Sequence, residues 1–235
     1  MHINLPLLKG LILTDWQLKK ENKPERLGNN MNTVKVTRKT TESEMSVVLD
    51  FSPIRSDYRE KIKTPIPFLN HMFEHIARRG GFNIDVSVKL DKFLLTHVIC
   101  EDLGIAFGKA LAEYINKTDG VVGYGDAIGI IDEAKAETVI SFESRALMII
   151  DYHNLEIPAQ VEGMDSQDLA VFLDGLAQGA SCTLQIDVLR GVNSHHIWEA
   201  VFRSVGQALN GVCKIDETRK GMTSGVAGKI NWTIE

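Results

Sequence analysis

Cysteine is scarce in this 235-residue chain, and basic residues are not in excess. The three cysteines form neither a CxxC pair nor an even framework, which argues against a disulfide scaffold and a cysteine-based zinc site. A reducing cytoplasm is the simplest setting for such a chain. The net charge of -5 excludes a general nucleic-acid binder, because such a protein carries a basic face.

Long apolar runs are missing as well. The apolar stretch 5–13 is interrupted by Lys9 and is too short to cross a bilayer. It lacks the basic start and the small-residue cleavage site of a signal peptide. The following stretch, 19–30, is polar. We therefore expect no membrane partner and treat residues 1–30 as an N-terminal extension or linker outside the fold.

One motif occurs twice. His97 precedes Glu101 by four residues, and His195 precedes Glu199 by the same distance. On a helix this spacing places both side chains on one face. A Gly-x-Ala-Leu segment follows each glutamate at the same distance, and an alternating strand pattern precedes each copy. The chain therefore looks like one βα module used twice.

Hydrophobic periodicity predicts an α+β fold with helices packed on sheets. The order strands, helix, strand, helix occurs twice, which predicts two pseudo-symmetric halves, residues 31–120 and 121–235. Segments 68–70 and 172–174 are expected to correspond, and 120–125 to form a glycine-rich turn. The predicted strands are 34–38, 45–51, 83–90, 134–142, 146–152 and 182–190, and the predicted helices are 68–79, 97–115, 165–178 and 195–210.

The repeated motif has the chemistry of a metal site. Imidazole and carboxylate are the usual ligands of a borderline transition metal, and a neutral histidine four residues from a carboxylate forms a chelating pair. The alternative is two solvated helix faces. Two matches in register inside a duplicated frame favour the metal.

Three further histidines bear on that site. His196 points about 100° away from its neighbour His195 on a helix, so the two are expected to face different ions or different subunits. His71 adds an imidazole from the first predicted helix. His75, one turn later, is expected on the helix surface, and compensation for a missing ligand is its alternative role.

Several segments together resemble the imidazoleglycerol-phosphate dehydratase family of histidine biosynthesis, over about residues 33–220. The matching segments are Arg38-Lys39-Thr40-Thr41-Glu42-Ser43, Phe68-Leu69-Asn70-His71-Met72, Gly80-Gly81-Phe82, Glu101-Asp102-Leu103-Gly104-Ile105-Ala106, Asp132-Glu133-Ala134, Ser144-Arg145 and Asn193-Ser194-His195-His196-Ile197-Trp198-Glu199-Ala200.

The resemblance implies a metal-dependent hydro-lyase that removes water from imidazoleglycerol phosphate. It also implies a large homo-oligomer of cubic symmetry, with manganese sites between subunits. The metal ligands carried over are His71, His97, Glu101, His195, His196 and Glu199. It places Glu42 or Glu199 as the proton-transfer carboxylate, and Arg145, Arg203 and Ser224 at the substrate.

The chain departs from the family pattern at four positions. Val98 and Gln185 stand where the family has histidine ligands, and Gly123 and Val226 stand where it has an arginine and a lysine. Lys229 substitutes for that lysine only if the loop is rearranged. We therefore expect reduced manganese occupancy and turnover far below that of a complete member.

Three interpretations of the function follow from these departures. The first is a working dehydratase with an altered metal site, and the second is a member with changed substrate or chemistry. The third is a catalytically silent paralogue that keeps the fold as a binding or assembly module.

Overall fold

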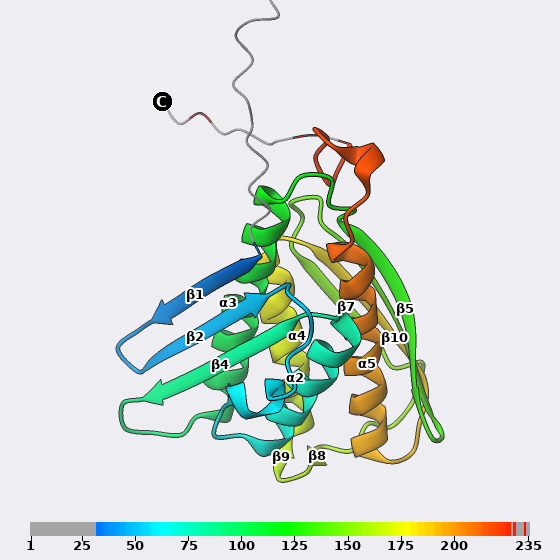
Figure 1. The fold of residues 1–235 in the computed structure, drawn as a ribbon. Helices are drawn as coiled ribbons and strands as arrows, with labels where there is room; N and C mark the ends of the chain where they lie inside the picture. Colours follow the sequence, from blue (N-terminus) through cyan, green and yellow to red (C-terminus); the bar gives the residue numbers. More distant parts are fainter. Residues whose placement is uncertain (1–31, 227, 229–232, 234–235) are drawn as a thin grey trace, which may run out of the picture.

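The computed structural model of the chain describes residues 32–226, 228 and 233. The predicted extension, residues 1–30, and Lys229 lie outside the described residues. Two four-stranded sheets stand on opposite sides of four helices (Figure 1). The elements are β1 (Thr33–Lys39), β2 (Ser43–Asp50), η1 (Tyr58–Lys61), β3 (Ile62–Lys63), α2 (Pro67–Gly80), β4 (Asn83–Leu90), α3 (Thr96–Lys117), β5 (Tyr124–Ile131), β6 (Ala134–Ser141), β7 (Leu147–Asp151), β8 (Gln160–Val161), β9 (Met164–Asp165), α4 (Ser166–Ala180), β10 (Thr183–Arg190), α5 (Ser194–Cys213) and η2 (Glu217–Arg219).

The two sheets share one topology. The first has the strand order β1-β2-β4-β3, and the second has the order β5-β6-β10-β7. In both, the first three strands pair antiparallel and the short fourth strand pairs parallel to its neighbour. The predicted α+β fold and its duplication are therefore confirmed. Glu101 and Glu199 are each the sixth residue of their helix, α3 and α5.

The helices join the halves across the centre of the molecule. α3 packs against α4, and α5 packs against α2, so each pair combines one helix from each half. In the α3–α4 pair the backbones meet closely. A Cβ on Gly104 would lie 2.2 Å from the carbonyl oxygen of Phe172, and one on Gly179 would lie 2.2 Å from that of Ile105. Only glycine permits this approach.

The ends of α2 and α4 show which residues correspond. Each helix is followed by a residue in the left-handed conformation, Gly81 (φ 74°) and Ser181 (φ 51°). Counting back from these caps pairs Phe68 with Asp168. The expected correspondence of segments 68–70 and 172–174 is therefore wrong by one helical turn. The two segments are similar in sequence, but they lie one turn apart when α2 and α4 are aligned.

Strand β5 was not predicted from the sequence. Its inward positions hold Gly125, Ala127 and Gly129 rather than large apolar residues. A Cβ on either glycine would lie 2.1 Å from a carbonyl oxygen of α5, so the small residues let α5 lie directly on the strand. In β5 the small residues therefore point inward and the large apolar residues point outward, which is the reverse of the usual half-buried strand.

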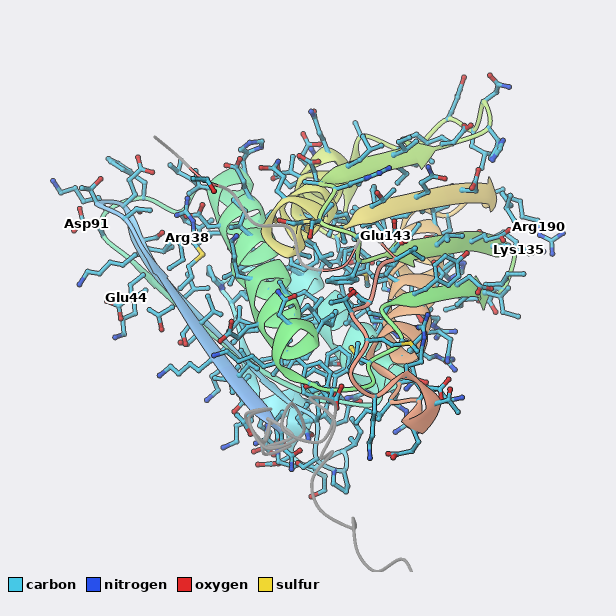
Figure 2. The ribbon with its side chains drawn as sticks, turned by 90° about the horizontal axis from the view of Figure 1, so that it is seen from above. Arg38, Glu44, Asp91, Lys135, Glu143 and Arg190 are labelled. Atoms are coloured by element: carbon cyan, nitrogen blue, oxygen red, sulfur yellow. The ribbon has the colours of Figure 1, made fainter. Side chains whose placement is uncertain are left out.

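The outward faces of the sheets differ, although their topology is the same. Figure 2 views the molecule from above, with the two sheets on opposite sides of the helices.

In the described part of the chain, no helix has the length and apolar character needed to cross a membrane.

Candidate metal and substrate site

Helices α2 and α5 bring together a cluster of imidazoles around one carboxylate. His71 and His75 lie one turn apart on α2, and their Nε2 atoms are 3.1 Å apart. Glu199 Oε1 is 3.2 Å from His75 Nε2, and Glu199 Oε2 is 3.5 Å from His71 Nε2. These three side chains offer ligand atoms that all lie within 4.8 Å of one another. Their arrangement suits a divalent metal ion.

The carboxylate at the centre of this cluster is buried, with Glu199 only 4% exposed. It also contacts His195 Nε2 at 3.2 Å and the guanidinium of Arg203. Burial by itself raises the pKa of Glu199, but the net shift is downward because His75, Arg203 and His71 surround it. Glu199 is therefore charged at neutral pH.

His75 is a member of the cluster and not a surface residue. Its side chain is 16% exposed, and burial lowers its pKa to about 4. The imidazole is therefore neutral at pH 7, the state in which it can bind a metal. The expectation of a helix-surface position was wrong. The i, i+4 spacing from His71 was the signal, because it puts both rings on one helical face.

The neighbouring histidines at the start of α5 face different partners, as their spacing predicts. Asn193 caps the helix by accepting hydrogen bonds from the backbone N–H groups of His195 and His196. The His195 ring contacts Glu162 through Nδ1 at 2.9 Å and lies against Phe68, with ring centroids 5.0 Å apart. It therefore stays on the side of the α2–α5 cluster.

His196 instead faces the turn between β5 and β6. Its Nδ1 is 2.8 Å from Glu133, and its Nε2 is 3.5 Å from Asp132. Hydrogen bonds from the backbone of Asn193 and from His196 lower the pKa of Glu133 to about 2, and the Glu133 hydrogen bond raises the pKa of His196. The sequence did not suggest Glu133 as the partner of this histidine.

The first copy of the motif, on α3, does not share the α2–α5 cluster. His97 is 3.3 Å from Asp168 of α4, and its side chain is 60% exposed. Glu101 is half-buried on the same helix. Within one chain, the six ligands implied by the resemblance are therefore divided among separate places.

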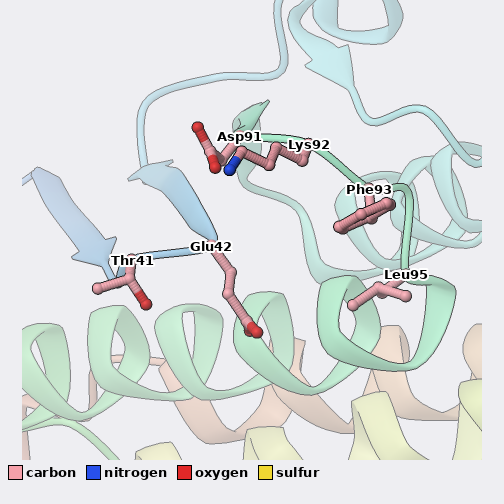
Figure 3. Close-up of a pocket in the computed structure, with 6 residues that line it drawn as sticks. All are labelled: Thr41, Glu42, Asp91, Lys92, Phe93 and Leu95. Atoms are coloured by element: carbon pink, nitrogen blue, oxygen red, sulfur yellow. The ribbon is translucent and has the colours of Figure 1, made fainter.

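Glu42 lines a small cavity of its own. The cavity has a volume of about 150 Å³ and is lined by Thr41, Glu42, Asp91, Lys92, Phe93 and Leu95. In Figure 3 the Glu42 side chain extends from the start of β2 toward α3. Among the described residues, no ion pair engages its carboxylate.

The three predicted substrate-binding residues do not meet in one chain. Arg203 donates to the carbonyl oxygen of Ile130, near one end of β5, and contacts Glu199. Ser224 donates to the carbonyl oxygen of Phe142, beyond the opposite end of β5, and exposed Arg145 lies close by in sequence. An eight-residue strand spans roughly 26 Å.

The four departures from the family pattern occupy different surroundings. Val98 is half-buried on α3, Gln185 is exposed on β10, and Val226 is fully exposed. Gly123 has a positive φ of 69°, and a Cβ there would lie 2.3 Å from Ser224 Cβ. No larger side chain fits at Gly123 without movement of Ser224.

Comparisons with known proteins agree with one another. The family model for imidazoleglycerol-phosphate dehydratase matches residues 64–209. A protein of that name from Burkholderia pseudomallei (strain 1710b) is 34% identical over 200 residues, which cover 85% of this chain and 100% of the relative. Another from Ralstonia pickettii (strain 12J) is 36% identical over 195 residues, covering 83% and 97%.

Solved structures of proteins from the same family are similar to this chain. The crystal structure of the Pyrococcus furiosus enzyme in complex with (S)-C348 has a TM-score of 0.69 at 29% identity, covering 83% of this chain and 99% of that one. The Staphylococcus aureus dehydratase has a TM-score of 0.65 at 25% identity, covering 77% and 99%.

Proposed function

This chain belongs to the imidazoleglycerol-phosphate dehydratase family, and from that premise we propose that it is a lyase that removes water from imidazoleglycerol phosphate in histidine biosynthesis. The observation that carries the proposal is the imidazole–carboxylate cluster of His71, His75 and Glu199, of which His71 and Glu199 lie on family motif segments. The comparisons do not favour a silent paralogue.

The proposal includes a divalent metal, with manganese as the expected ion. The donors fit it: two imidazole nitrogens and a buried, charged carboxylate face one another at 3.1 to 3.5 Å. His71, His195 and Glu199 would hold an ion at the α2–α5 cluster, and His97, Glu101 and His196 would contribute to the sites that subunits share. When bound, the metal supplies Lewis-acid stabilisation of negative charge on the substrate imidazole.

The chain's own residues supply the proton transfer and the positioning. Loss of water requires a base to take a proton from carbon while a hydroxide leaves from the neighbouring carbon with a proton. Glu42 is the better candidate for that base, because its carboxylate is unpaired in a cavity, whereas Glu199 is held by Arg203 and histidines. Arg145, Arg203 and Ser224 bind the phosphate in this proposal.

We further propose a large homo-oligomer whose subunits share active sites, located in the cytoplasm. The separation of Arg203 from Arg145 and Ser224 supports sharing, because one chain does not gather its own phosphate ligands. The exposed apolar loop Phe93–Leu95 beside His97 supports it too, with Phe93 72% exposed. A neighbouring subunit that covers this loop would also complete the first-half site.

The test is turnover by the purified full-length chain in the presence of manganese. We expect one ketone product for each imidazoleglycerol phosphate consumed, at a rate below that of a member with all eight family ligands. Glu42→Gln should lower kcat by about 10²- to 10⁴-fold, as expected for loss of a general base. Glu44→Gln, a carboxylate paired with Lys39 and Lys89 on the surface, is the matched control. Metal-loaded protein without turnover would contradict the proposed function.

A further inference from the structure

We propose that His75, together with His71 and Glu199, forms the part of a metal site that one chain supplies, with His75 as an additional imidazole ligand from α2. The inference rests on the proposed metal dependence of the enzyme and adds a ligand that the family motif does not assign. The site takes one borderline divalent ion, with Mn²⁺ as the probe of choice.

The distances between the donor atoms support this assignment. Donors bound to one ion at about 2.1 Å lie roughly 3.0 Å apart at a right angle and roughly 3.4 Å apart at the tetrahedral angle. His75 Nε2 lies 3.1 Å from His71 Nε2 and 3.2 Å from Glu199 Oε1, and His71 Nε2 lies 3.5 Å from Glu199 Oε2, so the two imidazoles face the two oxygens of one carboxylate. A single ion therefore fits among His71, His75 and Glu199 without a change of backbone.

The other half of the molecule shows that the fold does not require this cluster. At the positions that correspond to His71 and His75, α4 has Val171 and Gly175. A Cβ on Gly175 would lie 2.7 Å from the carbonyl oxygen of Glu101, so that level of α3–α4 has no room for an imidazole. The histidines of α2 therefore reflect chemistry special to the α2–α5 pair.

The coordination also leaves room for a substrate. Two imidazoles and one carboxylate leave positions open on a four- to six-coordinate ion, and His195 lies beside Glu199 Oε2 as a further donor. Arg203 contacts the same carboxylate and limits its negative charge. The competing interpretation is a hydrogen-bonded network in which His71 and His75 share one proton and no ion binds.

The experiment measures metal binding, not turnover. Full-length wild type, His75→Gln and the control His153→Gln are titrated with Mn²⁺, and free Mn²⁺ is followed by electron paramagnetic resonance. His153 belongs to the exposed group formed with Asp151 and Asp187, so its loss removes an imidazole elsewhere. We expect His75→Gln to raise the Kd by at least about 10- to 100-fold, and His153→Gln to leave the tight site unchanged.

A second variant covers the case in which His75→Gln is misfolded. His75→Cys is loaded with Co²⁺, and a thiolate-to-cobalt absorption band is expected only if position 75 binds the ion. Wild type serves as the blank, because it carries the same three native cysteines, Cys100, Cys182 and Cys213. A folded His75→Gln with wild-type affinity, or a cobalt-loaded His75→Cys without the band, would overturn the inference.

The outcomes separate this inference from the proposed function. Manganese-dependent turnover that survives His75→Gln with unchanged affinity rejects the role of His75 and keeps the function. Affinity that depends on His75 in a protein without turnover keeps the site and rejects the function. Wild type that binds no divalent metal rejects the site.

Discussion

The two halves of this chain have the same strand order and the same helix pairing, yet among the described residues an imidazole cluster surrounds a carboxylate in only one of the two helix pairs. Glu199 on α5 lies among His71, His75, His195 and Arg203. Its counterpart on α3 is Glu101, where Val171, Gly175 and Ile105 stand at the positions of His71, His75 and Arg203. His97, the counterpart of His195, lies 3.3 Å from Asp168 of α4. The duplicated backbone supplies two equivalent positions for a carboxylate. The side chains of the helix packed against each carboxylate determine whether an imidazole cluster forms around it.

The packing of the helix pairs gives the physical reason. α3 and α4 meet through glycines at backbone distance, which excludes large side chains between them. At the corresponding level of α5, Phe202 replaces Gly104, and the α2–α5 pair has side chains between its helices. At the level of Glu199 the α2–α5 pair therefore has room for imidazoles, whereas at the level of Glu101 the α3–α4 pair has none.

The outer faces of the sheets make a second contrast. β5 exposes Tyr124, Ile128 and Ile130, and β7 exposes Leu147 and Ile149. At the positions of Ile128 and Ile130, the first sheet has Thr37 and Lys39. Exposed apolar residues along edge strands are typical of protein interfaces. In the proposed homo-oligomer, we therefore expect the second sheet to be the face that meets another subunit.

The largest expected effect is on assembly. Ile128→Lys combined with Ile130→Lys should break a homo-oligomer into smaller species, because two charges would be buried at the contact. Thr37→Lys, at the position of Ile128 in the first sheet, should leave the assembly unchanged. Light scattering measures the particle mass of each protein. If both variants keep the assembled mass, or both lose it, the contrast between the two sheets is refuted.

The next effect concerns a partly buried ion pair that is present in the first half and not at the corresponding positions of the second. Arg38 of β1 lies 2.7 Å from Asp102 of α3, which is 3% exposed and whose pKa is raised by burial. The second half has Gly129 and Ala200 at these positions. Arg38→Met should lower the free energy of unfolding by about 2–4 kcal/mol, because it leaves the buried carboxylate of Asp102 without its cation and with the Ser43 hydroxyl as its remaining side-chain donor.

The control for that variant replaces both charges. Arg38→Met with Asp102→Leu should recover most of the lost stability in urea denaturation, since an apolar pair resembles the second half. If the double variant is no more stable than Arg38→Met, the cost arises from packing and not from an unpaired charge.

The close contact of α3 with α4 should respond to a single methyl group. Gly104→Ala places a Cβ 2.2 Å from the carbonyl oxygen of Phe172, so the free energy of unfolding should fall by about 1–3 kcal/mol. Gly211→Ala on α5, with its nearest contact at 3.2 Å, is the control and should change stability little. Urea denaturation measures both, and a neutral Gly104→Ala would show that the helices separate easily.

The smallest effect concerns the glycine at which the family pattern has an arginine. Gly123→Arg should lower the free energy of unfolding by about 1–2 kcal/mol, because φ is positive and Ser224 occupies the position of the Cβ. Gly221→Arg has a similar φ of 79° but no neighbour within 4 Å. The difference between the two variants therefore measures the cost of the contact with Ser224, separately from the cost of the positive φ. Thermal unfolding compares the two. A Gly123→Arg protein that is stable and binds substrate more tightly would mean that Ser224 moves aside.

The sequence contained enough signal for the helices but not for every strand. α3 and α5 follow from apolar periodicity and from the repeated His–Glu spacing. β5 did not, because its inward positions are Gly125, Ala127 and Gly129, and the pattern of large residues therefore points outward. His75 was assigned to the surface because a lone histidine on a helix usually lies there, and only the packing of α5 against α2 buries it.

By itself, the sequence determined the duplicated α+β fold, the family, and the two carboxylates at matching positions, because spacing along a helix or strand fixes which side chains share a face. Only the tertiary structure decided that Glu199 gathers His71 and His75 while Glu101 does not. These partners come from another helix, and their approach depends on whether glycines or large side chains separate the helix axes. Sequence spacing holds no information about that distance.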